Sequence, residues 1–324
     1  MDFTTLFKEF NNKNVLIVGD AMIDAYMWGE INRMSPEAPV PVVEIKKHEN
    51  RLGGAANVAL NLKALGANPI LCSVVGTGNR GVLFEELMDE SNLSTKGILS
   101  TNKRKTTIKT RVISENKHQL RIDEEETYPI AQEKEFLALT NSLIEDADVI
   151  ILQDYNKGVL TPLVIEGVIA SANKKGIPTI VDPKKQNFSS YKDCTIFKPN
   201  LAEIKAGMNI DFNADNVDEI ESASAELRNK LNAKGVLLTL SERGIAINSE
   251  EKFKHTPAFK RNIIDVSGAG DTVISIASLC LATNMDLVDL SVLSTLAGGI
   301  VCEEVGVVPI NKEKLLTEAI KHIQ

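Results

Sequence analysis

Short apolar runs alternate with amphipathic stretches along almost the whole chain, and this alternation constrains the fold more than any other feature. The runs are rich in β-branched residues and apolar on both faces, as expected for parallel strands that helices cover on two sides. They lie at 14–19, 70–76, 148–153, 178–182, 195–198 and 236–240. The stretches between them have helical spacing and lie at 55–65, 81–91, 133–145, 161–175, 217–233, 269–283, 286–304 and 311–323. The pattern predicts a doubly wound, mainly parallel α/β sheet with helices on both faces. No linker divides it, so we expect a single domain over residues 1–324.

Two regions depart from this pattern and are expected to form a small β-sheet. Residues 39–50 and 104–122 read as strands of roughly alternating polarity, and the SENK segment at 114–117 suits a hairpin turn. We interpret them as a lid inserted in the domain and lying over its open face. A pair of edge hairpins without a role in closure is the alternative.

The composition of the chain limits the kinds of molecule that it is expected to bind. The 36 Lys and Arg residues against 44 Asp and Glu give a formal net charge of −8, so no global basic field attracts nucleic acid or a membrane surface. No uncharged stretch is long and apolar enough to span a bilayer, and we find no signal peptide. The cysteines lack zinc-ligand spacing and favour buried free thiols, which fits a reducing cytoplasm; they are Cys72, Cys194, Cys280 and Cys302.

The segment DVSGAGDT at 265–272 is the first candidate for chemistry. Gly268, Ala269 and Gly270 precede a predicted helix, and a glycine turn there exposes backbone N–H groups beside the positive end of the helix dipole. Asp271 lies in the first turn of that helix, where it can face a hydroxyl that loses its proton as a phosphoryl group arrives. The alternative is a tight turn with a favourable N-terminal carboxylate.

Two segments near the amino terminus are candidates for binding a polyol. Gly53 and Gly54 precede a predicted helix, and Asn57 in its first turn can both donate to and accept from sugar hydroxyls. Asp20 and Asp24 follow the first strand, at the edge where open α/β sheets bind ligands. The alternatives are an ordinary helix start for Asn57 and loop capping for the two carboxylates.

Two further segments are candidates for binding a metal and a nucleotide. Asn200 and Glu203 share one side of a helical turn and could hold Mg²⁺ through water, although a capping box explains the same spacing. Ser241 and Gly244 end the last buried strand and could meet a nucleotide phosphate, or they could form an ordinary turn.

Taken together, the motifs resemble the PfkB (ribokinase-like) carbohydrate kinases over essentially the whole chain. GGAAN, NxxE and DxxGAGD occur in the order of that family. Further runs are similar to the group of kinases that act on D-glycero-β-D-manno-heptose 7-phosphate; they are VGDAMIDAYMWG, RMSPEAPVPV, RLGGAANVALNL, LRID, QDYNKGVLT and VDPK.

The resemblance implies a ribokinase-like fold and ATP- and Mg²⁺-dependent transfer to the anomeric C1 hydroxyl. The product would be the 1,7-bisphosphate, on the route to ADP-heptose and the lipopolysaccharide core. By position, Asp271 matches the catalytic base and Gly268, Ala269 and Gly270 the anion hole. The remaining matches are Asp24, Gly53, Gly54 and Asn57 for the sugar, Asn200 and Glu203 for magnesium, and Ser241 and Gly244 for the nucleotide. A monovalent cation, K⁺ in some relatives, would lie near Asp265, Val266 and Gly306.

The remote phosphate of such a substrate needs cations from the lid and its surroundings. The candidates are Lys109, Arg111, Arg121 and Lys157. Arg121 and Lys157 fall inside the motifs LRID and DYNKG and rank first. The alternatives are solvated lid charge for Lys109 and Arg111 and an ion pair with Asp123 for Arg121. Because unpaired lid strands leave open edges, we also expect a homodimer joined through the lid.

One departure from many relatives concerns a second, nucleotidyltransferase domain with an HxGH motif. The four histidines, His48, His118, His255 and His322, make no such motif. We therefore expect a stand-alone kinase with a separate nucleotidyltransferase, unless the chain is a piece of a longer one.

Three other readings compete with the heptose kinase. They are a fructose- or tagatose-phosphate kinase of the same family, a non-catalytic nucleotide or sugar sensor, and a dinucleotide-dependent oxidoreductase. The last would need a GxGxxG motif after the first strand, which residues 19–24 lack.

Overall fold

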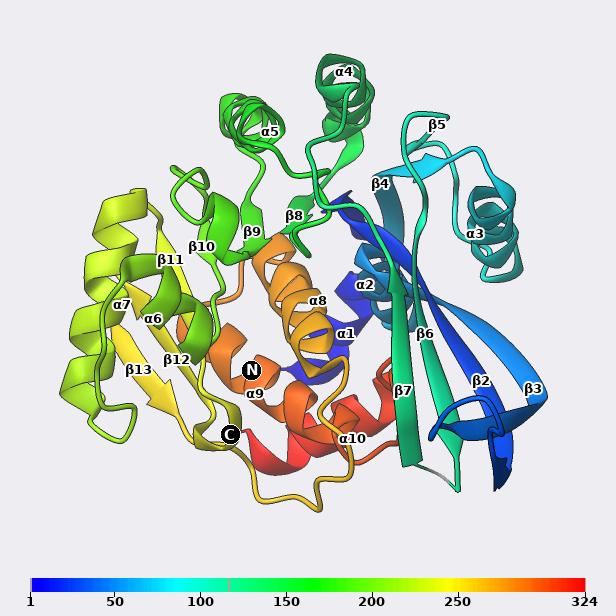
Figure 1. The fold of residues 1–324 in the computed structure, drawn as a ribbon. Coiled ribbons are helices and arrows are strands. Elements are labelled where there is room, and N and C mark those ends of the chain that lie inside the picture. Colours follow the sequence, from blue (N-terminus) through cyan, green and yellow to red (C-terminus); the bar gives the residue numbers. More distant parts are fainter. Residues whose placement is uncertain (1, 116, 324) are drawn as a thin grey trace.

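The computed structural model describes residues 2–115 and 117–323, and a nine-stranded sheet runs through its centre (Figure 1). Its spatial order is β13-β12-β11-β10-β9-β8-β1-β4-β5. The strands are β1 (Asn14–Gly19), β4 (Asn68–Gly76), β5 (Ile98–Thr101), β8 (Val149–Gln153), β9 (Thr179–Asp182), β10 (Ile196–Phe197), β11 (Gly235–Thr239), β12 (Ile245–Ser249) and β13 (Phe253–Thr256). Pairing is parallel from β11 through β5, whereas β12 and β13 are antiparallel additions at one edge.

The apolar runs form strands because both of their faces are buried. In β1, Val15 and Ile17 pack into one hydrophobic core and Leu16 and Val18 into the other. A strand between two helix layers has no polar face, which is why the sequence shows an unbroken apolar run there. The prediction of a mainly parallel sheet is confirmed, and all six predicted strands are present.

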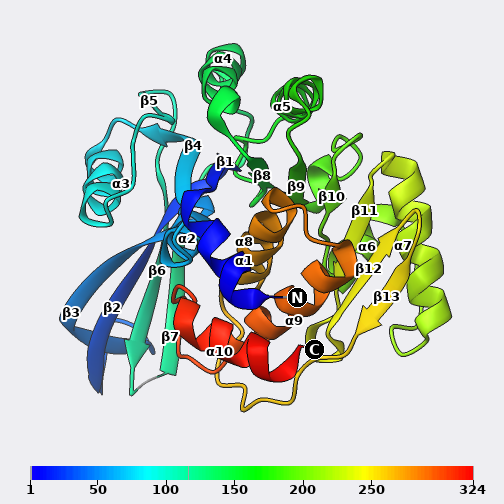
Figure 2. The same ribbon diagram turned by 180° about the vertical axis from the view of Figure 1, so that it is seen from behind.

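Helices cover both faces of the large sheet (Figure 2). The helices are α1 (Phe3–Glu9), α2 (Ala55–Ala64), α3 (Asn79–Glu90), α4 (Glu133–Leu143), α5 (Pro162–Lys175), α6 (Leu201–Met208), α7 (Val217–Leu231), α8 (Ala269–Ala282), α9 (Leu287–Val301) and α10 (Lys312–His322). One core contains residues of α1, α2, α3, α8, α9 and α10, and the other contains residues of α4 to α7. The eight predicted helices are confirmed, α6 contains the helical turn predicted at Asn200 and Glu203, and α1 is additional.

A separate four-stranded sheet, the small sheet, stands at one side of the molecule (Figure 1). Its order is β3-β2-β6-β7, with β2 at Ala21–Met34, β3 at Pro41–Gly54, β6 at Thr107–Ser114 and β7 at Lys117–Glu124. The strands predicted at 39–50 and 104–122 are therefore found, as β3 and the β6–β7 pair. Asn116 of the predicted SENK turn lies outside the described residues.

The segment after β1 differs from the sequence interpretation, which took residues 19–24 as the loop at the end of that strand. Asp20 is such a residue, but Asp24 lies inside β2, opposite Arg51 of β3. Ile23 and Ala25 pack into the core while Asp24 points to the other face of the small sheet. Sequence analysis missed β2 because both of its faces are buried over residues 21–26. A buried strand of this kind lacks the regular alternation of apolar and polar residues that marks a half-exposed strand.

Two further properties agree with the composition. The four cysteines are buried free thiols, and burial raises the pKa of the Cys72 thiol to about 12. Within the described parts of the chain, we find no helix that is both long and apolar enough to cross a bilayer.

Candidate active site

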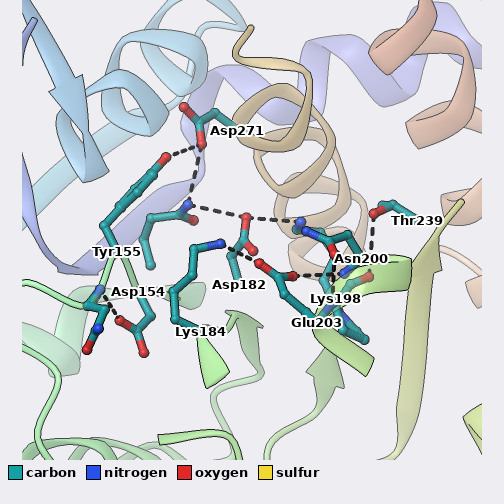
Figure 3. A network of polar contacts seen from close by, with 12 residues as sticks. Asp154, Tyr155, Asp182, Lys184, Lys198, Asn200, Glu203, Thr239 and Asp271 are labelled. Carbon is teal, nitrogen blue, oxygen red and sulfur yellow. Dashed lines mark hydrogen bonds and ion pairs between the residues drawn. The ribbon is translucent and has the colours of Figure 1, made fainter. Parts of the chain in front are cut away.

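The amino end of α8 meets the carboxyl ends of β8 and β9 near the centre of the large sheet (Figure 3). Gly268 has a φ of +80°, in the left-handed region that favours glycine. As the N-cap it brings no side chain to the first N–H groups of the helix. Ala269 and Gly270 follow, and the only side chain that these two residues contribute is the methyl group of Ala269. Ala269 N donates to the Val266 carbonyl at 3.3 Å, so the turn leaves the N–H groups of Gly270 and Asp271 to an anion at the positive end of the helix dipole.

Donors from two other parts of the fold hold the Asp271 carboxylate, and Figure 3 shows the one from Tyr155. The Tyr155 hydroxyl donates to Oδ1 at 2.6 Å, and Asn57 Nδ2 donates to Oδ2 at 2.6 Å. Gln153 Nε2 lies 3.4 Å from Oδ1. Burial raises the pKa of Asp271 to about 6, and the bonds from Tyr155 and Asn57 oppose that shift. A carboxylate with a fixed orientation and a pKa near neutrality suits the removal of a proton from a bound hydroxyl.

A buried ion pair lies beside this turn, between Lys198 after β10 and Asp182 at the end of β9 (Figure 3). Lys198 Nζ is 2.9 Å from Asp182 Oδ2, and the two side chains are 3% and 10% exposed. A Cβ built on Gly270 would be 3.9 Å from Asp182 Oδ2 and 4.0 Å from Lys198 Nζ, so both members of the ion pair lie beside the turn. The Lys198 ammonium thus lies close to the α8 turn, with its charge paired to Asp182.

Asn200 and Glu203 form the capping box that was the alternative to a magnesium site. Glu203 N donates to Asn200 Oδ1 at 2.8 Å, and Asn200 N donates to Glu203 Oε2 at 2.9 Å. The other Glu203 oxygen pairs with Lys184. With both Glu203 oxygens engaged by the cap and by Lys184, the magnesium site at this pair stays a prediction. Across residues 2–115 and 117–323, no cluster of three or more His, Cys, Asp or Glu side chains could hold a metal ion.

Asp20 lies at the predicted edge but faces a loop, residues 155–159, instead of open space. The residue is 1% exposed. Its Oδ2 accepts from the backbone N–H groups of Tyr155 at 2.9 Å and Lys157 at 3.0 Å, and its Oδ1 accepts from Val159 at 3.0 Å. Loop capping, the alternative interpretation, describes this contact. Asp20 thereby fixes the backbone that carries Tyr155.

The polar face of the small sheet carries Asp24. Its carboxylate pairs with Arg111 of β6 and is 6% exposed. The Tyr26 ring lies 4.9 Å from the Arg51 guanidinium and 5.4 Å from that of Arg111. A Cβ on Gly53 would overlap Asp24 Oδ2, so the glycine makes room for this carboxylate.

The paired glycines also shape the entry to α2. Gly54 has a φ of +59°, and a Cβ there would lie 2.5 Å from the Asp20 carbonyl oxygen. The chain can therefore turn from β3 directly into α2, which places Asn57 beside Asp271.

The predicted phosphate-reading cations fall into two groups. Lys157 Nζ lies 2.9 Å from Glu125 Oε1, with an 11% exposed side chain. Burial lowers the pKa of Lys109, and the positive charge of Lys157 adds to that effect. Arg121 instead extends from the exposed strand β7 and binds Asp123 through two hydrogen bonds of 2.8 and 2.9 Å. The ion pair that was its alternative is present.

The remaining predicted residues lie in turns. Ser241 and Gly244 have φ of +53° and +93° and join β11 to β12, and a Cβ on Gly244 would collide with the Thr256 carbonyl. Asp265 Oδ2 accepts from the Gly306 backbone N–H at 2.9 Å, which ties together the two segments predicted for a monovalent cation.

Sequence reasoning missed five side chains that the structure brings to this site. They are Gln153, Tyr155, Asp182, Lys184 and Lys198, which end or follow the neighbouring strands β8, β9 and β10. The motifs QDYNKG, VDPK and KPNLAE contained them. The signal was their position, because the carboxyl ends of adjacent parallel strands meet at one edge of a sheet.

Comparison with known sequences covers nearly the whole chain. A family model described as pfkB family carbohydrate kinase matches residues 12–314. The bifunctional protein HldE of Citrifermentans bemidjiense is 37% identical over 322 residues, which cover 97% of this chain and 65% of that protein. HldE of Desulfatibacillum aliphaticivorans is 40% identical over 311 residues, covering 94% of this chain and 63% of that protein. The chain thus spans less than two thirds of the length of these relatives.

Solved structures share the fold. Phosphofructokinase-2 from Escherichia coli, in complex with potassium, has a TM-score of 0.78 at 18% identity and covers 94% of this chain and 98% of its own. Arabidopsis thaliana ribokinase, complexed with ribose and ATP, has a TM-score of 0.73 at 19% identity with the same coverage of 94% and 98%. The predicted ribokinase-like fold is confirmed.

Proposed function

Because the chain belongs to the pfkB family of carbohydrate kinases, we propose that it transfers the γ-phosphoryl group of ATP to the anomeric hydroxyl of D-glycero-β-D-manno-heptose 7-phosphate. The observation that carries the proposal is the meeting of Asp271, the open turn of α8 and Lys198 at one point. The product, the 1,7-bisphosphate, would feed ADP-heptose and lipopolysaccharide core synthesis. The choice of sugar rests on the motifs that resemble heptose 7-phosphate kinases.

Asp271 supplies the base in this proposal. One carboxylate oxygen accepts the proton of the C1 hydroxyl as the sugar oxygen attacks the γ-phosphorus. With its pKa at about 6, the carboxyl is mostly ionised at neutral pH and still basic enough to help. Its bonds to Tyr155 and Asn57 fix which way the oxygens point.

Hydrogen-bond donors in fixed positions stabilise the negative charge on the transferred phosphoryl group. The first N–H groups of α8 bind the phosphoryl oxygens, and the Lys198 ammonium beside the turn adds a positive charge. Magnesium, when bound with ATP, would neutralise phosphate charge, with Asn200 and Glu203 holding it through water. Ser241 and Gly244 are the proposed contacts to the nucleotide, and Asp265 and Gly306 mark the proposed place for K⁺.

The sugar and its remote phosphate would lie against the small sheet. Asp24 and Asn57 face the sugar hydroxyls in this proposal, and Gly53 and Gly54 allow close approach. Lys157 pairs with Glu125, and its positive charge lowers the pKa of Lys109, which Glu125 and Asp123 raise in turn. A phosphate dianion between the two ammonium groups would relieve their repulsion. Arg111 of β6 and Arg121 of β7 lie opposite each other on the small sheet, which also carries Lys109.

The small sheet is also the proposed dimer interface. Leu120 and Ile122 on β7 are 58% and 44% exposed, and β7 is an edge strand. Pairing with a second copy would cover both the open strand edge and these apolar side chains. We propose a cytoplasmic homodimer. None of the four histidines stands in an HxGH motif, so we propose that nucleotidyl transfer belongs to another domain or protein.

A substrate panel with a matched pair of variants tests the proposal. We expect ADP release with heptose 7-phosphate to exceed that with unphosphorylated heptose, fructose phosphates and tagatose phosphates. Lys157→Ala should raise KM for heptose 7-phosphate by about ten-fold to a hundred-fold, since a charge-assisted hydrogen bond is worth roughly 1.5–3 kcal/mol. Lys174→Ala, an exposed lysine on α5, is the control.

Two results would contradict the proposal. Preference for another sugar phosphate would point to a different member of the family. ATP binding without turnover of any sugar would favour the non-catalytic sensor.

A further inference from the structure

Tyr155 is the residue whose contact with the proposed base no motif anticipated. Its hydroxyl donates to Asp271 Oδ1 at 2.6 Å, and the residue is the second after the end of β8. Asn57 holds the other carboxylate oxygen from α2 at 2.6 Å. The base is thus clamped from two sides by groups on different elements, which leaves little freedom to its orientation.

The loop that carries Tyr155 is held far more firmly than a surface loop requires. The buried carboxylate of Asp20 accepts from three of its backbone N–H groups. From the other side, Arg104, which is 8% exposed, donates through Nη2 to the Lys157 carbonyl. Arg104 Nε and Nη1 have no hydrogen-bond partner among the described residues. Two buried charged side chains, Asp20 and Arg104, therefore hold the backbone of the loop at 155–159.

Burying a charged side chain costs folding free energy, so we infer that the position of this loop is important for the function of the site. Gly158 adds a second constraint, because its φ is +87° and a Cβ there would run into the Tyr128 carbonyl. The buried charges and the Gly158 turn both act on the same short stretch of backbone. They fix the Tyr155 backbone relative to β1 and β8, and hence the hydroxyl relative to α8.

We propose that Tyr155 is a positioning residue that orients the Asp271 carboxylate toward the acceptor hydroxyl and keeps it ionised, with Asp20 and Arg104 holding its loop in place. This inference rests on the proposed kinase function of the same site. Tyr155 does not exchange its own proton. The proton of the sugar hydroxyl goes to Asp271, the sugar oxygen bonds to the γ-phosphorus, and the bond from that phosphorus to the bridging oxygen breaks to release ADP.

The expected pH effect has a definite sign. The charged groups facing Asp271 are Asp182 at the end of β9, which raises its pKa, and Lys198 after β10, which lowers it. The Tyr155 and Asn57 hydrogen bonds also lower it, against the larger effect of burial. Removing the phenol hydroxyl leaves the other groups in place, so the pKa of Asp271 must rise.

The experiment compares Tyr155→Phe with wild type and with Tyr128→Phe, which removes the hydroxyl of an exposed tyrosine. The acid limb of the kcat/KM profile should move to higher pH by about 1 to 2 units in Tyr155→Phe, because a hydrogen bond to a charged group is lost. KM for ATP should be little changed. Tyr128→Phe should follow wild type.

A second measurement does not depend on the substrate. Aspartate carboxyl carbons labelled with ¹³C are titrated by NMR, and the Asp271 signal is the one missing from Asp271→Asn. Its midpoint should rise by about 1 to 2 pH units in Tyr155→Phe. An unchanged midpoint in a folded Tyr155→Phe protein would overturn the positioning role. A shifted midpoint in a protein that phosphorylates no sugar would leave that role standing and reject the kinase proposal instead.

Discussion

Replacing Asp271 by asparagine removes the proposed base while keeping its shape. The amide oxygen can accept from Asn57 as the carboxylate does, and the amide nitrogen can donate to the Tyr155 hydroxyl oxygen, which then acts as acceptor. The hydrogen-bonded frame around α8 therefore survives. We expect Asp271→Asn to fold and to bind ATP with little change.

Its turnover should fall by about 10² to 10⁴, the range typical for loss of a general base. KM for ATP should be little affected, because the amino end of α8 keeps its backbone donors.

The same change should make the protein more stable at neutral pH. Burial raises the pKa of Asp271 from 3.8 to about 6, and one pKa unit corresponds to about 1.4 kcal/mol. Keeping this carboxylate ionised in the folded state therefore costs at most about 3 kcal/mol of folding free energy at pH 8. The folded pKa is the higher one, so the cost is small below about pH 4, grows as pH rises to about 6 and levels off above that. Between pH 5 and 8 the advantage of the asparagine variant should grow by about 1 kcal/mol.

Urea unfolding of both proteins at several pH values from 5 to 8, together with steady-state kinetics, measures both effects. Asp89→Asn, on the exposed face of α3, is the matched control. If Asp271→Asn keeps more than about a tenth of wild-type kcat, Asp271 is not the base and the helix-cap interpretation holds. A stability difference that stays flat from pH 5 to 8 would refute the reasoning about its buried charge.

Three further predictions concern the neighbourhood of the site. Lys198→Met should cost about 3–5 kcal/mol of unfolding free energy by stranding a buried carboxylate, and adding Asp182→Asn should recover much of it in a double-mutant cycle. Gly53→Ala should raise KM for the sugar by displacing the adjacent Asp24 carboxylate, whereas Gly78→Ala, with open space around it, should not. Light scattering at micromolar concentration should give the mass of a dimer, and an all-monomer result would reject pairing through the small sheet.

The strand-and-helix framework could be predicted because burial on both faces leaves a direct trace in the sequence. The run at 14–19 is an example, since the four side chains from Val15 to Val18 are all apolar and buried. Helix boundaries were equally legible at α5, where Thr161 caps the first turn and Gly176 ends the last with a φ of +69°. Strand β2 left no such trace, because the face opposite its core-packed side chains carries the buried and paired carboxylate of Asp24.

The site was only partly predictable for a related reason. The turn before α8 and Asn57 are marked by glycines that the backbone requires, so their positions stand out. Tyr155 and Lys198 are marked by nothing local. Their function comes from the spatial order of β8, β9 and β10, which sequence alone does not give. Conversely, the NxxE pattern of Asn200 and Glu203 predicted both a metal site and a capping box, and the side chains form the box.

Phosphorus NMR of the complete reaction tests the central claim most directly. Wild-type protein, ATP, magnesium and D-glycero-β-D-manno-heptose 7-phosphate should give one new phosphorus signal coupled to the anomeric proton. The 7-phosphate signal should remain, the γ-phosphorus signal of ATP should fall by the same amount, and Asp271→Asn should give almost no product. The account would be contradicted if ATP yields only inorganic phosphate, or if the new phosphate appears on a different sugar phosphate and not on this heptose.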